Sequence, residues 1–248
     1  HPLGRRILLV GDLINRGPDS IGVLETARRL HENGTALVIL GNHEFRLIQR
    51  SVAQKPLDDE HFNRYLPWIR TLPLFLETAT LRSVHAAWHY SSIQVLRESQ
   101  ANDDSFVKKT LDKETAERKA VQNILSGIKV RLPLDPILRD RFDVPREKGR
   151  VKWWKNLEGK SFDECLYSPM YPNVWDQAPS HQEIAQVEPY LEKDKLVCIG
   201  HYSLPPEIEK VMGPIVCVDG CVTKDKILWA YRHNGESRPS SKNLITCG

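Results

Sequence analysis

Hydrophobic and polar positions in the first third of the chain alternate in blocks that predict strand, helix and strand. Residues 6–10 and 36–40 are short apolar runs ended by glycine, a pattern typical of buried strands. Between them Ile21, Leu24, Ala27 and Leu30 recur every third residue, which predicts a helix capped at Asp19 or Ser20. Two strands joined by a helix predict a βαβ unit with parallel strands.

The same pattern predicts further strands at residues 74–76, 81–84 and 197–200. The runs at 215–218 and 227–231 are interpreted as a closing antiparallel pair. Residues 91–159 differ in character, with a charged, helix-favouring run at 113–125. We interpret 91–159 as an insertion or cap within a single domain that spans residues 1–248.

Composition narrows the class of protein. The chain has 248 residues, 40% of them hydrophobic and 27% charged, as in ordinary globular domains. No run approaches 18 apolar residues, so no membrane partner is expected. The net charge of +3 is too small and scattered to favour nucleic acid. Five cysteines, an odd number, predict no disulfide framework and favour a reducing, cytoplasmic location.

Four predicted strands are each followed at once by a polar residue that can bind a metal: Asp12, Asn42, His85 and His201. Ligands of α/β sheets bind where the carboxyl ends of the strands meet. One carboxylate, one amide oxygen and two imidazoles suit borderline divalent ions better than calcium or magnesium. Each residue alone has an ordinary alternative role, as a turn cap, a helix cap or a hydrogen-bonded core histidine.

The order of these segments resembles a known family. The motifs are Gly11-Asp12-x-x-Asn15-Arg16-Gly17, Gly41-Asn42-His43-Glu44, Val84-His85-Ala86 and Gly200-His201. Together they resemble the calcineurin-like metallophosphoesterases of the phosphoprotein phosphatase type, and they are similar to the bacterial symmetrical diadenosine tetraphosphate hydrolases. The resemblance implies an α/β fold, a four-layer α/β/β/α sandwich with a helical insertion.

The resemblance also implies roles for individual residues. Asp12 would bridge two divalent metal ions, and Asn42, His85 and His201 would complete the shell of one of them. Manganese is the expected metal, with iron, zinc and cobalt as alternatives. The dinuclear centre would activate a water molecule for attack on a phosphoryl group.

Three further residues would act on the substrate. His43 would be the general acid, assisted by Asn15, and Arg16 would hold the phosphoryl oxygens. The partner would be a phosphorylated substrate, namely a phosphoprotein, a nucleotide or a small phosphoester.

The chain departs from the family pattern in two ways. The opening G-D-x-H-G motif is absent, so one metal site lacks its family ligands, and we expect an N-terminal βα unit of roughly 30 residues to be missing before His1. Asn15 stands where the family has aspartate. Asparagine can accept a hydrogen bond from His43 but carries no charge, so the pKa of His43 should be lower and acid catalysis weaker.

Three functions follow as hypotheses. The first is a metal-dependent phosphomonoesterase or Ser/Thr phosphoprotein phosphatase-like hydrolase. The second is a dinucleoside polyphosphate hydrolase. The third, of another class, is a phosphate- or metal-binding protein with little turnover. Two aromatic features stay open between a role and simple packing: Trp153-Trp154 as a nucleobase platform, and Tyr202 as a donor to phosphate.

Overall fold

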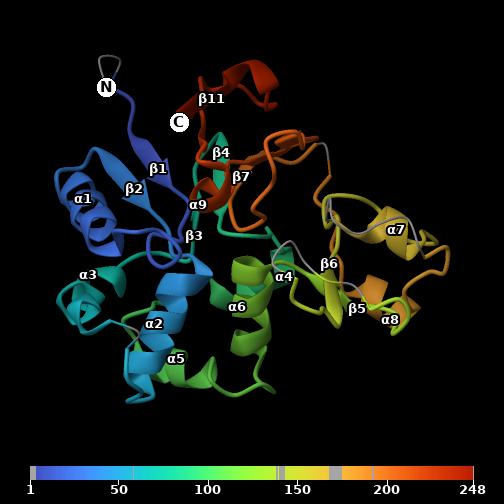
Figure 1. Ribbon diagram of the computed structural model, residues 1–248, viewed down its shortest axis with the longest axis horizontal. Helices are drawn as coiled ribbons and strands as arrows, with labels where there is room; N and C mark the ends of the chain where they lie inside the picture. The colour runs from blue at the N-terminus through green and yellow to red at the C-terminus, as the bar shows by residue number, and fades with distance from the viewer. Residues whose placement is uncertain are drawn as a thin grey trace.

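The computed structural model describes residues 4–57, 59–137, 139, 143–167, 175–191 and 193–247. Its first elements are β1 (Ile7–Leu9), α1 (Ser20–Glu32) and β2 (Ala36–Val38). The two strands are parallel, with Ile7 opposite Ala36. Asp19 caps α1 by accepting a hydrogen bond from the Gly22 amide at 2.7 Å. The predicted strand–helix–strand unit with parallel strands is therefore confirmed (Figure 1).

A five-stranded sheet forms the centre of the molecule. Its strands lie in the order β3 (Phe75–Glu77), β4 (Leu81–Val84), β7 (Leu196–Ile199), β9 (Ile215–Cys217) and β8 (Val211–Met212). The three inner strands are parallel, and both edge strands run antiparallel to their neighbours. Every residue of β7 and β9 is buried, as expected of strands covered on both faces.

The predicted pairing of 215–218 with 227–231 is wrong. β9 lies parallel to β7, while β10 (Leu228–Tyr231) pairs antiparallel with β11 (Leu244–Cys247). The burial patterns give the physical reason. β9 is buried throughout and takes an inner position, whereas β10 alternates exposed and half-buried residues, which suits a small outer sheet. That outer pair lies at the top of Figure 1.

The helices that follow β2 and β4 lie together in the lower half of Figure 1, below the central sheet. They are α2 (Asn42–Val52), η1 (Glu60–Arg64), α3 (Leu66–Ile69), α4 (Tyr90–Leu96), α5 (Asp104–Lys109) and α6 (Ala116–Ser126). α6 overlaps most of the run 113–125 predicted to be helical and ends one residue beyond it, and Thr115 caps it by accepting from the Arg118 amide. The Ala86 amide donates to the Ile124 carbonyl at 2.8 Å, which ties α6 to the end of β4.

A short hairpin follows α6, made of β5 (Lys129–Arg131) and β6 (Lys148–Arg150). The remaining elements are α7 (Phe162–Cys165), α8 (His181–Ala185), α9 (Val222–Asp225) and η2 (Ser241–Asn243). Val130 of the hairpin and Ile124 of α6 share one buried cluster with Leu24 and Ile199. Across the part of the chain described, no helix has the length and apolar character needed to cross a membrane.

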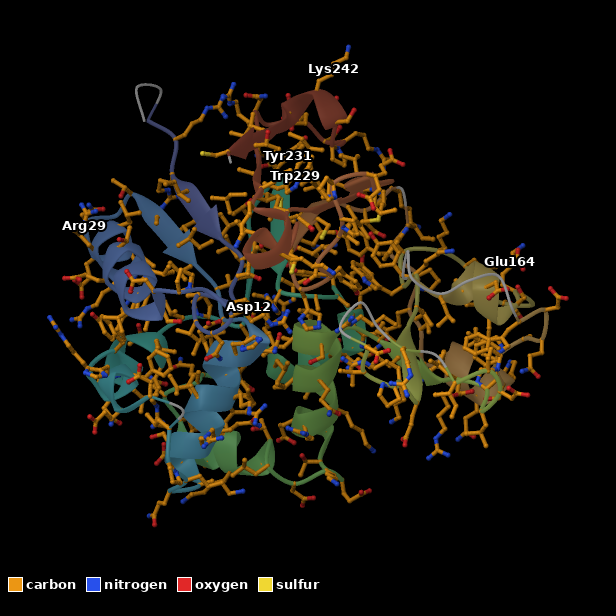
Figure 2. The ribbon with its side chains drawn as sticks, viewed as in Figure 1. Asp12, Arg29, Glu164, Trp229, Tyr231 and Lys242 are labelled. Atoms are coloured by element: carbon orange, nitrogen blue, oxygen red, sulfur yellow. The ribbon has the colours of Figure 1, made fainter. Side chains whose placement is uncertain are left out.

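The carboxyl ends of three strands meet at one place. The His85 ring, just after β4, donates from Nδ1 to the Val10 carbonyl at the end of β1, over 2.6 Å. The Gly200 amide, just after β7, donates to the His85 carbonyl at 2.9 Å. Asp12 lies at this meeting point, near the middle of the molecule in Figure 2. The fold thus brings together segments that are more than a hundred residues apart in sequence.

Candidate metal and phosphate site

The loop after β1 has a tightly constrained backbone. Gly11 has a φ of +88°, and a Cβ there would lie 2.4 Å from the Gly41 nitrogen and 2.9 Å from His85 Nδ1. Only glycine allows these two loops to approach so closely. Asp12 itself has a φ of +58°, in the left-handed region that aspartate tolerates better than most residues with a side chain. The loop therefore holds the Asp12 carboxylate in one orientation.

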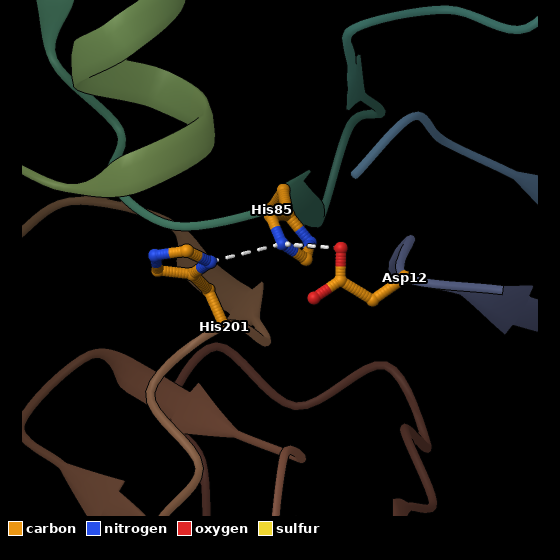
Figure 3. Close-up of side chains that lie close together, drawn as sticks. All are labelled: Asp12, His85 and His201. Atoms are coloured by element: carbon orange, nitrogen blue, oxygen red, sulfur yellow. Dashed lines mark hydrogen bonds and ion pairs between the residues drawn. The ribbon is translucent and has the colours of Figure 1, made fainter. Parts of the chain in front are cut away.

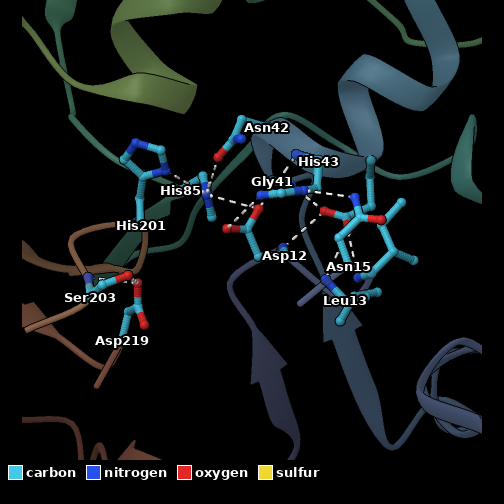
Figure 4. A network of polar contacts seen from close by, with 12 residues as sticks. Asp12, Leu13, Asn15, Gly41, Asn42, His43, His85, His201, Ser203 and Asp219 are labelled. Atoms are coloured by element: carbon cyan, nitrogen blue, oxygen red, sulfur yellow. Dashed lines mark hydrogen bonds and ion pairs between the residues drawn. The ribbon is translucent and has the colours of Figure 1, made fainter. Parts of the chain in front are cut away.

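The Glu44 side chain of α2 holds this loop in place through hydrogen bonds to its backbone amides. Its carboxylate is fully buried and accepts hydrogen bonds from the backbone amides of Asp12, Leu13, Ile14 and Gly41, at 2.8–3.2 Å. Burial and the nearby Asp12 charge raise the pKa of Glu44, whereas the amide donors favour its ionised form. Three of the donor residues, Asp12, Leu13 and Gly41, are labelled in Figure 4. Sequence reasoning gave Glu44 no role, although its place in Gly-Asn-His-Glu marked it.

The four sequence-predicted ligands lie together around one atom, His85 Nε2. Asp12 Oδ1 is 3.2 Å from it, Asn42 Oδ1 is 3.1 Å and His201 Nδ1 is 3.2 Å (Figures 3 and 4). Donor atoms that share one divalent ion at about 2.0–2.2 Å lie roughly 3 Å from one another. The spacing of the set is thus that of a metal coordination shell.

The chemistry of the donors also fits a metal ion. His85 is buried and donates its Nδ1 proton to the Val10 carbonyl, so its neutral form presents a lone pair at Nε2. This is the usual arrangement of a metal-binding histidine, whose second nitrogen donates to a carbonyl or carboxylate. Asp12, His85 and His201 together form a group whose ligand atoms lie within 4.8 Å of one another. These residues therefore fit a divalent metal ion.

Electrostatics couples the two central residues. Burial alone would raise the pKa of Asp12, but the charge and hydrogen bond of His85, with those of His43, outweigh it and lower the pKa. Burial would lower the pKa of His85, but Asp12 outweighs it and raises the pKa. The Asp12 carboxylate and positive charge at the position of His85 Nε2 thus stabilise each other. A divalent cation would supply that positive charge instead.

Arg150 is a residue of this site that sequence reasoning did not assign to it. It ends β6, and its Nη2 lies 2.9 Å from His201 Nε2. Because a guanidinium can only donate, His201 accepts at Nε2 and carries its neutral proton on Nδ1. Burial and the Arg150 charge hold the pKa of His201 well below its usual range. Metal binding through Nδ1 would require the proton to move to Nε2 and Arg150 to turn away.

His43, at the start of α2, lies beside this set. Its Nε2 is 4.0 Å from Asp12 Oδ2, and its Nδ1 is 2.8 Å from Asn15 Nδ2. An amide nitrogen only donates, so Asn15 donates to His43 rather than accepting from it, contrary to our expectation. The neutral ring then carries its proton on Nε2, facing Asp12. Burial lowers the pKa of His43, and the positive charge of Arg16 adds to that effect.

The three aromatic residues singled out in the sequence are buried and held in packing contacts. Trp153 and Trp154 are 0% and 8% exposed and meet edge to face, with ring centroids 5.6 Å apart. Tyr202 is also buried and accepts a hydrogen bond from Trp153 Nε1 at 3.1 Å. The packing alternative therefore holds for all three residues. Arg16, by contrast, is exposed in the loop after Asp12 and has a left-handed φ of +61°.

Comparison with known proteins agrees with this geometry. The family model for calcineurin-like phosphoesterases matches residues 5–205. A symmetrical bis(5'-nucleosyl)-tetraphosphatase of Photobacterium profundum is 26% identical over 241 residues, covering 86% of this chain and 79% of the relative. The one from Neisseria meningitidis is 27% identical over 214 residues, covering 79% and 70%.

A third tetraphosphatase of the same name, from Nitrosospira multiformis, is 33% identical over 105 residues. That match covers 37% of this chain and spans little more than a third of the relative, 38% of its length. The family match extends over most of the chain, and it confirms the predicted α/β metallophosphoesterase fold. The chain belongs to the calcineurin-like phosphoesterase family, whose members are metal-dependent phosphoester hydrolases.

Proposed function

We propose that this chain hydrolyses phosphoesters at a divalent metal centre. Asp12, Asn42, His85 and His201 would hold one ion, with manganese as the expected metal and iron, zinc and cobalt as alternatives. The observation that carries the proposal is the meeting of three oxygen and nitrogen ligand atoms around His85 Nε2, each 3.1–3.2 Å away. Asp12 would also face the second ion that the family uses.

The bound ions would polarise the phosphoryl group and lower the pKa of an attacking water molecule. The chain's own residues supply the rest. His43 presents an Nε2 proton toward Asp12, where a leaving oxygen could take it. Arg16 lies near enough for its charge to act on His43, and Arg150 reaches His201. Their guanidinium groups would hold the phosphoryl oxygens as negative charge develops.

A dinucleoside polyphosphate is the first candidate substrate. It is favoured by the name shared by the relatives from Photobacterium, Neisseria and Nitrosospira. A phosphomonoester, free or on a protein, is the second candidate. It is favoured because Trp153 and Trp154 are buried and offer no face on which a nucleobase could stack.

The alternative of binding with little turnover rests on the Asn15–His43 pair. Since Asn15 donates to Nδ1, no carboxylate stabilises the protonated form of His43 at that nitrogen, and acid catalysis should be weaker than with aspartate.

One assay separates the three functions. The protein, loaded with manganese, is given diadenosine tetraphosphate, p-nitrophenyl phosphate and a phosphoserine peptide side by side. Hydrolysis of the first alone supports the tetraphosphatase, and hydrolysis of the other two supports the monoesterase. Metal bound with no turnover of any substrate supports the binding protein. The variant His43→Gln, which cannot donate a labile ring proton, serves as the catalytic control.

Two wider features belong to the proposal. Residues 91–159 would act as a cap on the single domain, since α6 meets the end of β4 through the Ala86 amide and the Ile124 carbonyl. The protein would work in the cytoplasm, because all five cysteines are unpaired thiols that suit a reducing compartment.

A further inference from the structure

The hairpin β5–β6 carries a row of cations on one face. Lys129 pairs with Arg150 and Arg131 pairs with Lys148, so these four side chains point to the same side of the ribbon. Val130 and Gly149 between them are buried, and a Cβ on Gly149 would meet the Leu132 and Leu166 side chains. The apolar face therefore packs inward and the cationic face points outward. We call the four side chains Lys129, Arg131, Lys148 and Arg150 the basic ribbon.

Placing like charges opposite one another across a strand pair destabilises the pair. The cost is visible at Lys129. Although the residue is exposed overall, desolvation of its ammonium and the charges of Arg150, Arg146 and Lys148 lower its pKa to about 8. Glu183 of α8 lies against Arg131, but its carboxylate accepts from the Arg131 backbone amide and from Ser180. Arg131 and Lys148 are exposed, whereas Arg150 is half-buried, donates from Nε to the Ser126 carbonyl at 3.1 Å and lies over the Tyr202 ring.

The basic ribbon begins at the metal and phosphate site. Arg150 contacts the proposed ligand His201 at 2.9 Å, and Lys129 lies opposite Arg150 across the strand pair. Two residues along a strand advance about 7 Å. The outer pair, Arg131 and Lys148, therefore lies about 7 Å along the hairpin from the inner pair. The four side chains form a continuous basic face that starts at the site.

We propose that the basic ribbon binds the phosphate groups that follow the reacting one in a nucleoside polyphosphate chain. The proposal rests on the hydrolase function proposed above and selects its substrate class. A phosphomonoester would reach only the inner pair, because a single phosphoryl group at the metal site has no further anion to place on Arg131 and Lys148. A polyphosphate carries an anion at each step and would neutralise both pairs.

Binding of inorganic phosphates to the manganese-loaded protein tests this directly. Calorimetric titrations compare tripolyphosphate with orthophosphate for the wild type and for the double variant Arg131→Gln/Lys148→Gln. Both side chains are exposed and at the outer end of the ribbon, so the fold and metal content should be unchanged. Lys242→Gln is the matched control, because Lys242 is an exposed cation far from Asp12 (Figure 2).

The expected result is a loss confined to the longer anion. The double variant should bind tripolyphosphate about tenfold or more weakly, as expected for lost hydrogen bonds between charged groups, and orthophosphate as the wild type does. Raising the salt concentration should weaken the binding of tripolyphosphate less in the double variant than in the wild type. Equal affinity of the wild type for both anions, or equal losses for both in the double variant, would overturn the proposal.

Turnover measured on the same samples distinguishes a failure of the basic ribbon from a failure of the proposed hydrolase function. If the selective loss of tripolyphosphate binding is seen but diadenosine tetraphosphate and p-nitrophenyl phosphate are left intact, the ribbon is supported and the hydrolase function fails. If both are hydrolysed but the double variant loses no kcat/KM on diadenosine tetraphosphate, the hydrolase stands and the ribbon is overturned.

Discussion

The side-chain amide of Asn15 donates a hydrogen bond from Nδ2 to Nδ1 of His43 over 2.8 Å. The direction of this bond decides which ring nitrogen of His43 carries its proton in the neutral form. Since Nδ1 accepts, the proton is on Nε2 and faces the Asp12 carboxylate, 4.0 Å away. The ring is thus oriented as a proton donor, but nothing at Nδ1 stabilises its charged form.

Replacing Asn15 by aspartate should raise the pKa of His43. In Asn15→Asp the carboxylate accepts from Nδ1–H and stabilises the imidazolium. Protonated His43 then persists to higher pH, so the alkaline limb of the kcat–pH profile moves upward. Turnover at neutral pH should rise about tenfold, part of the 10²–10⁴-fold that acid–base catalysis supplies. Aspartate also tolerates the left-handed φ of +69° at this position. A pH profile identical to that of the wild type would contradict this role of the pair.

Removing a proposed ligand should release the metal ion. In His201→Ala, manganese should bind more than about 100-fold more weakly, since losing a residue that only orients a ligand already costs 10–100-fold. Metal content is measured by elemental analysis after gel filtration. His61→Ala is the matched control, because His61 is an exposed histidine that bonds to Asp59. Unchanged manganese in His201→Ala would remove His201 from the ligand set.

A pair of glycine substitutions isolates the close approach of the two site loops. Gly11 and Gly34 have similar left-handed φ angles, +88° and +75°, but only Gly11 has neighbours where a Cβ would lie. Gly34→Ala should cost about 1–2 kcal/mol of stability from backbone strain. Gly11→Ala should cost about 3 kcal/mol or more, because overpacking adds to the strain. Urea unfolding of both variants measures the difference, and equal losses would show that the loops can move apart.

The binding of polyanions should weaken as the pH rises through about 8, the pKa of Lys129. A bound polyphosphate favours the charged ammonium, so binding takes up a proton and affinity falls once the free ammonium deprotonates. Titrations of tripolyphosphate on metal-free protein between pH 7 and pH 9.5 measure this. In Lys129→Arg the guanidinium stays charged throughout, so the decline should be smaller. Parallel pH curves for the two proteins would show that Lys129 is not the group whose deprotonation weakens binding.

Much of the local structure could be read from the order of residues. Apolar runs predicted β1, β2, β4 and β7. β7 is buried throughout, as expected of a strand covered on both faces. The prediction of a buried strand is wrong for β1, where Ile7 is 48% exposed and the other two residues are half-buried, because β1 pairs with β2 alone among the described strands. The pairing of the closing strands was not predicted correctly. The run at 215–218 is a strand, but its neighbours are β7 and β8 rather than the run at 227–231. The pattern of hydrophobic residues along a strand indicates whether the strand is buried, but it does not indicate which strand lies next to it.

The sequence by itself determined the family motifs, the βαβ start and the four polar residues that end up around His85 Nε2. These depend on local patterns and on residue types at strand ends, which parallel topology brings to one edge. Only the tertiary structure decided that Asn15 donates to His43 and that Trp153 and Trp154 are buried. It also showed that Arg150 contacts His201, which lies 51 positions further along the chain. Such relationships depend on how distant segments pack, and packing is fixed by the whole chain at once.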